Sequence, residues 1–157
     1  RSTVGTITEI YDFLRLLFAR VADAYSYETG ERMVSYTTQQ IGESITEKFA
    51  NNGIYLMAPL VKGRKGHYRE LFEKLGKQGY SKVRIDGEIV EIVKGLQADR
   101  YKTHDIEVII DRLMIDHNSY QDQRFKRSLS TALTVGKGSL IVSTKEANFL
   151  QFYSQHL

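Results

Sequence analysis

The stretch from residue 80 to residue 93, YSKVRIDGEIVEIV, limits the possible folds of this chain more than any other. Apolar and polar residues alternate in it, which is the period of a strand with one buried face. Val83 and Ile85 are expected to face inward. Asp86-Gly87 favours a two-residue hairpin turn, because both residue types tolerate a left-handed backbone. An antiparallel strand pair is therefore predicted, and its outward face carries Lys82, Arg84 and Asp86.

Helical periodicity marks the first fifty residues. Thr6 begins a predicted helix over residues 6–21, and Thr37 begins a second one that runs to NNG at residues 51–53. Each Thr is followed three residues later by Glu or Gln, which is the spacing of a capping box. The polar stretch DAYSYETGER between the two predicts a turn.

The rest of the chain alternates between strands and helices. IYLMAPLV, residues 54–61, predicts a strand buried on both faces, with Pro59 at an end or an edge because proline cannot donate a ladder hydrogen bond. A helix is expected from Gly66 or His67 to Gly79. The remaining expected elements are a strand at HDIEVIIDRLMI, a helix through Phe125, Leu129, Ala132 and Leu133 that ends at Gly136, and two closing strands, SLIVST and NFLQFY, around KEAN.

These segments predict an α/β or α+β fold with a mixed sheet of about five to six strands. Helices are expected to cover mainly one side of the sheet. Residues 1–53 are expected to form an N-terminal helical segment, and residues 54–157 the sheet-containing domain.

Composition narrows the class of protein. The 157 residues contain no Cys, so neither a disulfide framework nor a thiolate metal site is possible. Because no apolar run approaches the length of a membrane span and no signal sequence is evident, we expect a cytoplasmic protein without a membrane segment. Because the first residue is not Met, we expect a fragment or a processed chain.

The positive charge is concentrated in one short stretch. The formal net charge of the chain is +3. Lys62, Arg64, Lys65 and Arg69, set against Glu70, already account for that excess. Such a distribution favours one local basic feature over a surface that binds DNA indiscriminately.

Catalytic motifs are absent from the sequence. GRKGHY and VGKGSL both lack the spacing of a phosphate-binding loop, and there is no G-x-S-x-G elbow. The four histidines, which do not converge in sequence, are expected at the surface or at strand ends, and Glu107 and Asp111 on a solvated strand face. The histidines are His67, His104, His117 and His156.

What remains is charge of both signs on rigid elements. An Asp on the outward face of the hairpin would repel phosphate, whereas ion pairs across a protein interface give selectivity. A protein partner is therefore favoured, and a nucleic-acid-binding module that uses the basic cluster at residues 62–69 is the alternative. An enzyme of unrecognised type is a third possibility, without a motif to support it.

Four strings in this order resemble the UvrA family of bacterial nucleotide excision repair. They cover most of the chain, with the first resembling part of signature domain I and residues 55–157 the inserted module that binds UvrB. The strings are RSTVGTITEIYDFLRLLFARV, PLVKGRKGHY, GYSKVRIDGE and HDIEVIIDRLMI.

The resemblance implies a docking module for UvrB without catalysis of its own. The whole protein of this family is a dimeric ABC-type ATPase that recognises DNA damage, and its ATP sites lie in regions that this chain does not contain. Because the family's interface with UvrB is charged, the candidate partner-binding residues are Arg64, Lys65, Arg69, Lys82, Arg84, Asp86, Asp111 and Arg112.

The chain departs from the family pattern at a structural zinc site. Members usually carry Cys-x-x-His soon after the LLFAR helix. Ser26 and Thr29 stand at the matching positions, and neither side chain supplies a thiolate or imidazole ligand. No metal site and no cofactor are therefore expected in this fragment, although zinc and ATP are implied for the whole protein.

Overall fold

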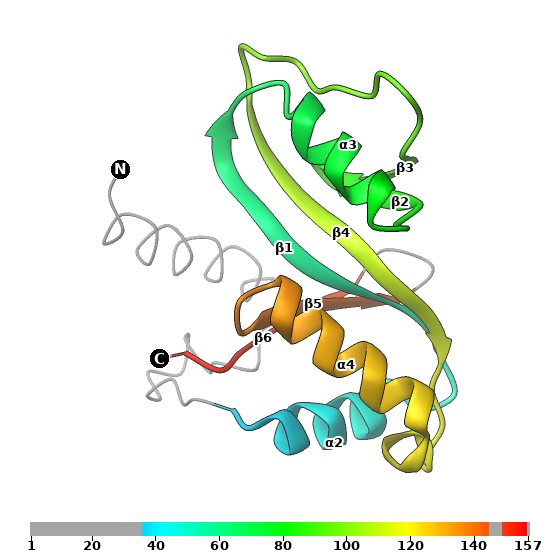
Figure 1. Cartoon of the computed structure of the whole chain (residues 1–157). Helices are drawn as coiled ribbons and strands as arrows, with labels where there is room; N and C mark the ends of the chain where they lie inside the picture. The colour runs from blue at the N-terminus through cyan, green and yellow to red at the C-terminus, as the bar shows by residue number, and fades with distance from the viewer. Residues whose placement is uncertain (1–35, 145–148, 157) are drawn as a thin grey trace. The chain divides into compact units, whose positions relative to one another are not determined.

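A computed structural model of the chain describes residues 36–144 and 149–156 (Figure 1). Helices and strands alternate along most of this part. The elements are α2 (Thr38–Lys48), β1 (Gly53–Lys65), α3 (Arg69–Lys77), β2 (Lys82–Ile85), β3 (Glu88–Glu91), β4 (Thr103–Met114), the short 3-10 helix η2 (Ser119–Gln121), α4 (Gln123–Val135), β5 (Ser139–Thr144) and β6 (Leu150–Ser154).

The six strands form one sheet in the order β3-β2-β4-β1-β5-β6. β2 pairs with β3 and β4, and β5 pairs with β1 and β6, all in antiparallel orientation. The predicted α+β class and the upper end of the predicted strand number are confirmed. The pairing of SLIVST with NFLQFY is confirmed as well, whereas KEAN lies outside the described residues.

The chain divides into two compact units. Of the described residues, unit 1 contains 36–58, 110–144 and 149–156, and unit 2 contains 59–109. Strands β1 and β4 contribute residues to both. The expected boundary between residues 53 and 54 stays a prediction, because the helix expected over residues 6–21 and the turn after it lie outside the described part.

Helix α2 forms where its capping box predicts it. The side chain of Thr37 accepts a hydrogen bond from the backbone N–H of Gln40 at 3.0 Å, and Gln40 Oε1 accepts one from the N–H of Thr37 at 2.8 Å. Ile41 and Ile45 are buried on one face of the helix. The helix stops before Asn51, whose φ of 69° is left-handed as expected.

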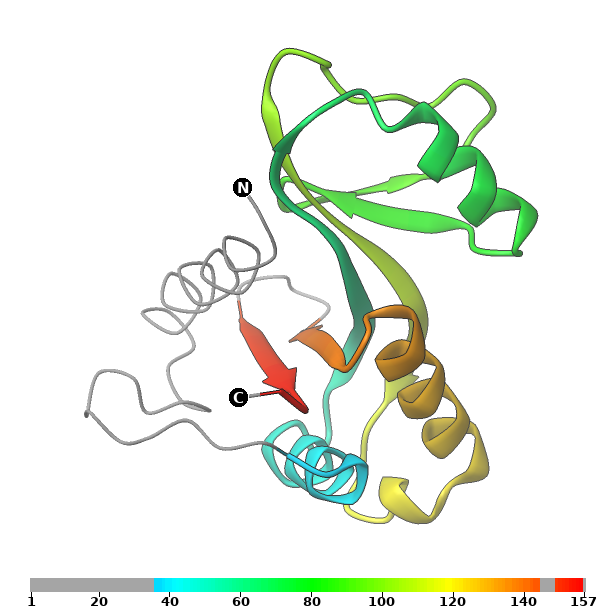
Figure 2. The same ribbon diagram turned by 60° about the vertical axis from the view of Figure 1, so that its left-hand side comes forward.

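The core of unit 1 lies between its two helices and its strands. α2 and α4 lie beside each other in both views of the ribbon (Figures 1 and 2). Each contributes side chains at helical spacing, which confirms the predicted helix that Gly136 caps. The most buried members of this core are Ile41, Ile45, Phe49, Ile54, Leu56, Ile115, Phe125, Leu129, Ala132, Leu140, Val142 and Tyr153.

Pro59 does not lie at a strand end, which corrects that part of the prediction. β1 is 13 residues long and continues past Pro59 to Lys65. The register with β5 covers Ile54 to Met57, so Pro59 follows that pairing. Its missing N–H therefore costs β1 no hydrogen bond to β5 in the paired stretch, which is the physical reason why a proline is tolerated there.

In unit 2, α3 lies beside the β2–β3 hairpin, and parts of β1 and β4 complete the unit (Figure 2). The hairpin turns at Asp86 and Gly87, with φ values of 51° and 90°, as the sequence predicts. α3 begins at Arg69, later than Gly66 or His67, because Tyr68 has a left-handed φ of 57° that cannot continue a helix. The buried residues of this unit include Phe72, Leu75, Val83, Ile106 and Val108.

Within the described residues, no helix is both long and apolar enough to span a membrane.

Candidate functional site

The predicted partner-binding residues are divided between the two units. Six belong to unit 2, where Arg64 and Lys65 end β1, Arg69 begins α3 and the other three belong to the hairpin. Asp111 and Arg112 belong to unit 1. Unit 2 contains eleven Lys and Arg and eight Asp and Glu, so it carries the whole net charge of +3.

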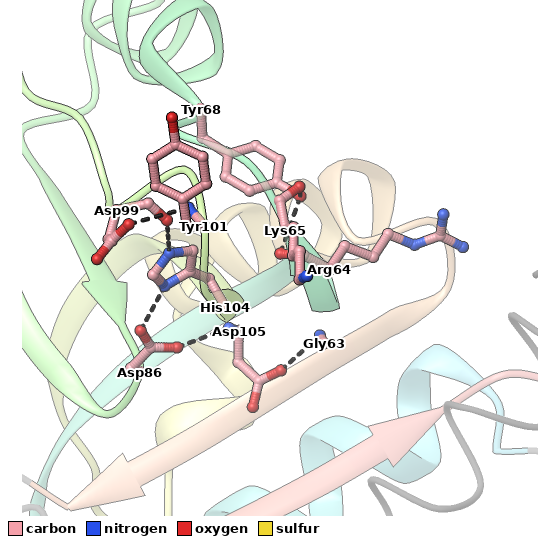
Figure 3. Close-up of polar contacts among 9 residues, drawn as sticks. All are labelled: Gly63, Arg64, Lys65, Tyr68, Asp86, Asp99, Tyr101, His104 and Asp105. Atoms are coloured by element: carbon pink, nitrogen blue, oxygen red, sulfur yellow. Dashed lines mark hydrogen bonds and ion pairs between the residues drawn. The ribbon is translucent and has the colours of Figure 1, made fainter.

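A tight turn displays Arg64 and Lys65 at the end of β1, and both side chains are exposed. Gly63 has a φ of 61° and Gly66 a φ of 145°, which are conformations that favour glycine. The hydroxyl of Tyr68 donates to the backbone carbonyls of Arg64 at 3.2 Å and Lys65 at 3.0 Å. In the close-up, the Arg64 side chain extends away from the surrounding polar residues (Figure 3).

Carboxylates fix this turn to the rest of unit 2. Asp105 Oδ1 accepts a hydrogen bond from the N–H of Gly63 at 2.8 Å (Figure 3). The N–H of Asp105 in turn donates to Asp86 Oδ1 at 2.8 Å, and the N–H of Asp86 donates to the carbonyl of Asp105 at 2.8 Å. The basic turn and the hairpin turn are therefore linked through one residue of β4.

His104 lies at the centre of this polar cluster and is only 5% exposed. Its Nδ1 is 2.6 Å from Asp86 Oδ2, and its Nε2 is 2.6 Å from the carbonyl oxygen of Asp99. The hydrogen bond to Asp86, followed by the one to the Asp99 carbonyl, raises the pKa of His104 despite its burial. His104 lies at the start of β4, which agrees with the strand-end alternative of the prediction, and it is buried rather than at the surface.

A loop before β4 presents an aromatic side chain beside the same cluster. Tyr101 is 78% exposed, and its N–H donates to Asp99 Oδ1 at 2.9 Å. Ala98 holds the loop to the start of α3 by donating its N–H to the carbonyl of His67 at 2.7 Å. Asp99 and Tyr101 are not among the predicted site residues, although the run Asp-Arg-Tyr-Lys, residues 99–102, is a polar segment that contains an aromatic residue.

Glu107 is buried and Arg84 is half-buried, which corrects the expectation that both side chains are solvated. Arg84 Nη1 lies 3.2 Å from Glu107 Oε1, and the two side chains are 15% and 2% exposed. Burial raises the pKa of Glu107 to about 7, while the nearby cations Arg84 and Lys62 oppose that shift. Burial also lowers the pKa of Lys62 to about 7. The antiparallel register places Arg84 opposite Glu107, so the two charges compensate one another inside unit 2.

The other unit 2 candidates lie at the surface. Arg69 Nε lies 3.5 Å from Glu73 Oε2 on the next turn of α3, and both side chains are about half exposed. Lys82 is half-buried at the start of β2. An exposed pair such as Arg69–Glu73 contributes little to stability, so Arg69 can change partners at low cost.

In unit 1, Asp111 contacts α4. Its carboxylate accepts from Arg124 at 2.7 and 3.1 Å and from Ser128 Oγ at 2.6 Å. Burial alone would raise the pKa of Asp111, but these bonds and one from the backbone of Arg112 outweigh it and lower the pKa. Arg112 is exposed, with its guanidinium 5.7 Å from the ring centroid of Tyr55.

The described part of the chain contains no group of three or more His, Asp or Glu side chains that could hold a metal ion. Ser26 and Thr29 lie outside the described residues. What the arrangement offers is a rigid, charged surface with an exposed aromatic residue, which is suited to binding a charged partner.

Comparisons with known proteins agree on one family. A family model described as the UvrA interaction domain matches residues 36–146. UvrABC system protein A of Methanothermobacter thermautotrophicus is 41% identical over 157 residues, which is 99% of this chain and 16% of that protein. The proteins of the same name from Bacillus subtilis and Thermus thermophilus are each 40% identical to this chain, over 156 and 157 residues respectively. Each of these alignments covers 99% of this chain and 16% of the relative. The chain thus spans about a sixth of the length of these relatives.

Proposed function

The chain belongs to the UvrA family, as a DNA-repair module that covers the family's interaction domain, and we propose that it docks UvrB through the basic surface of unit 2. The observation that carries the proposal is the rigid turn that displays Arg64 and Lys65. Because its backbone is already fixed by Tyr68 and Asp105, little conformational entropy is lost when a partner binds.

Charge complementarity supports an acidic surface on the partner. Unit 2 holds the whole positive excess of the chain, and part of its basic charge is neutralised internally by the Arg84–Glu107 pair. Arg64 and Lys65 are exposed and therefore accessible to a carboxylate, which Arg can bind through two parallel hydrogen bonds. Of the predicted contact residues, these two have the strongest support, followed by Arg69 and Lys82.

Asp86 and Arg84 act on docking indirectly in this proposal. Asp86 holds both Asp105 and His104, and Arg84 compensates the buried Glu107. Their substitution would disturb the shape of unit 2 rather than remove a contact. Asp111 and Arg112 belong to unit 1, and of these Arg112 is the exposed side chain available to a partner.

Isothermal titration calorimetry of the chain with purified UvrB tests the proposal. We expect a complex whose affinity falls between low and moderate salt, because exposed charges are screened over roughly 10 Å at 0.1 M salt. The proposal is abandoned if no complex forms at either salt concentration.

Nucleic-acid binding is a second candidate, which the loop at residues 99–102 favours. Tyr101 is 78% exposed between Arg100 and Lys102, and an aromatic ring flanked by cations can stack on an unpaired base. Electrophoretic shift of single-stranded and duplex DNA at about 50 mM salt tests it, since binding of this kind weakens steeply with salt. Absence of a shift with both DNAs would dismiss it for this chain.

For the whole protein, we propose the activity that the family resemblance implies. That protein would be a cytoplasmic dimeric ATPase that recognises DNA damage, with its ATP and zinc sites in other regions. The chain itself would contribute the docking of UvrB and carry no catalytic step.

A further inference from the structure

Both ring nitrogens of His104 face hydrogen-bond acceptors. The carbonyl oxygen of Asp99, 2.6 Å from Nε2, can only accept, and the carboxylate of Asp86, 2.6 Å from Nδ1, accepts when it is ionised. A neutral imidazole has one N–H and cannot satisfy both. The hydrogen-bond network therefore assigns a proton to each nitrogen, which makes His104 an imidazolium.

This imidazolium joins three separate segments of unit 2. It holds the β2–β3 turn through Asp86 and the loop of Tyr101 through Asp99. Asp86 also accepts from the N–H of Asp105, whose carboxylate accepts from the N–H of Gly63 (Figure 3). The path from His104 to the basic turn thus consists of three consecutive hydrogen bonds, all of them through charged groups or backbone amides.

We propose that protonated His104 is the positioning residue that holds the turn of Arg64 and Lys65 in the geometry that binds UvrB, an inference that rests on the proposed function. His104 touches no partner itself. The inference goes beyond the docking function because it names a buried residue outside the charged set that the sequence predicted, and because it makes docking depend on one proton.

The titratable groups around His104 come from three directions. Asp86 faces it from the hairpin turn, Asp99 from the preceding loop, and Tyr68 from the start of α3, with its ring edge-on at a centroid distance of 6.5 Å. Burial raises the pKa of Tyr68, so this phenol stays neutral over the range in which His104 titrates. The two carboxylates favour the charged imidazole, and no cation is among these neighbours.

The direction of the pH effect follows from the raised pKa of His104. The charged form is bound more favourably in the folded chain than in the unfolded one. Its contribution is complete below the unfolded pKa of about 6.5 and is lost as the pH rises through the folded pKa. Above that point one ring nitrogen presents a lone pair to an acceptor, and the Asp86 or Asp99 contact must open.

The first test uses the free 157-residue chain. Nitrogen-15 spectra of the imidazole should show both nitrogens protonated at pH 7, with a titration midpoint clearly above 6.5. Hydrogen exchange at the Gly63 amide, corrected for its intrinsic pH dependence, should accelerate across that titration, because the hydrogen bonds that link this amide to His104 open when the imidazolium loses its proton. A midpoint near 6.5, or Gly63 exchange that ignores the titration, overturns the inference.

Matched variants connect the proton to docking. His104→Gln keeps one donor but cannot be charged, and His117→Gln removes an exposed histidine of unit 1 as the control. We expect the affinity ratio of wild type to His104→Gln for UvrB to fall by roughly fivefold or more from pH 6 to pH 9, the lower end of the usual coupling between two sites. The corresponding ratio for His117→Gln should stay constant, and the titration of UvrB itself cancels in both ratios.

The two proposals fail separately. If UvrB binds and the ratio of the wild-type affinity to the His104→Gln affinity is the same at every pH, the positioning role is refuted and the docking proposal stands. If UvrB does not bind at all, docking fails, and Gly63 exchange still decides whether His104 controls the basic turn. The nitrogen-15 titration and the Gly63 exchange use the wild-type chain only. They still decide the inference if the His104→Gln chain does not fold.

Discussion

Replacing Asp111 with Ala should destabilise the chain by about 2 kcal/mol, because its carboxylate accepts four hydrogen bonds. Two come from the guanidinium of Arg124 at 2.7 and 3.1 Å, one from Ser128 Oγ at 2.6 Å and one from the N–H of Arg112 at 2.8 Å. The Asp111 side chain is 15% exposed, so water replaces few of these bonds in the folded wild type.

The magnitude follows from the exposure of the donors. Arg124 is 60% exposed, so its guanidinium regains water when Asp111 is removed and the ion pair contributes little to stability. Ser128 is half-buried and regains water less completely, and a hydrogen bond to a charged group contributes about 1.5 kcal/mol or somewhat more. These contributions are not additive, which leaves a total of about 2 kcal/mol.

Urea denaturation followed by far-UV circular dichroism at pH 7 measures this loss. The hydrogen bonds lower the pKa of Asp111, so its contribution is present above the unfolded pKa and disappears as the pH falls through the folded one. The difference between wild type and Asp111→Ala should therefore shrink in acid. Arg112→Ala, which removes the exposed neighbouring cation, is the control and should change stability by about 0.5 kcal/mol or less. An Asp111→Ala chain as stable as wild type at pH 7 would refute the reasoning.

Three further changes test other parts of the fold. Gly42→Ala should destabilise the chain by about 1 to 2 kcal/mol, because a Cβ there would lie 2.5 Å from ring carbons of Tyr120. Gly76→Ala, whose Cβ would have its nearest contact 3.4 Å away, should instead stabilise it by up to about 1 kcal/mol through helix propensity. Thermal melts compare the two variants, and equal effects would contradict the close packing at Gly42. Thr37→Ala should cost about 1 kcal/mol in urea denaturation through loss of the capping bond, and an unchanged midpoint would contradict it. His104→Gln should be less stable than wild type at pH 6, and most of this difference in stability should disappear by pH 9. Urea midpoints at both pH values measure it. A difference that stays constant would contradict the assignment of the imidazolium.

Local signals in the sequence predict most of the elements. The capping box at Thr37 and Gln40 and the Asp86–Gly87 turn each depend on residues a few positions apart, so the sequence contains the whole determinant. The helix through Phe125 follows equally from its spacing. The strand-end alternative predicted for Pro59 was wrong, because the position depends on where the pairing of β1 with β5 ends.

The site was predictable only where it consists of one continuous segment. Arg64 and Lys65 lie between two glycines in one short stretch, and the local excess of basic residues there is visible in the sequence. The burial of Glu107 depends on the register that places it opposite Arg84, 23 residues away in the chain. The partners of His104 likewise come from two other segments, so no spacing rule within β4 could reveal them.

The central claim, that Arg64 on its fixed turn is a contact with UvrB, is tested most directly by one matched pair in calorimetry. Arg64→Glu and Arg127→Glu change the net charge equally, but Arg127 is exposed on α4 of unit 1. We predict that Arg127→Glu binds UvrB like wild type and that Arg64→Glu binds more weakly by about 1 to 3 kcal/mol, the usual range for an interface residue of this kind. Equal affinities for the two variants would contradict the account.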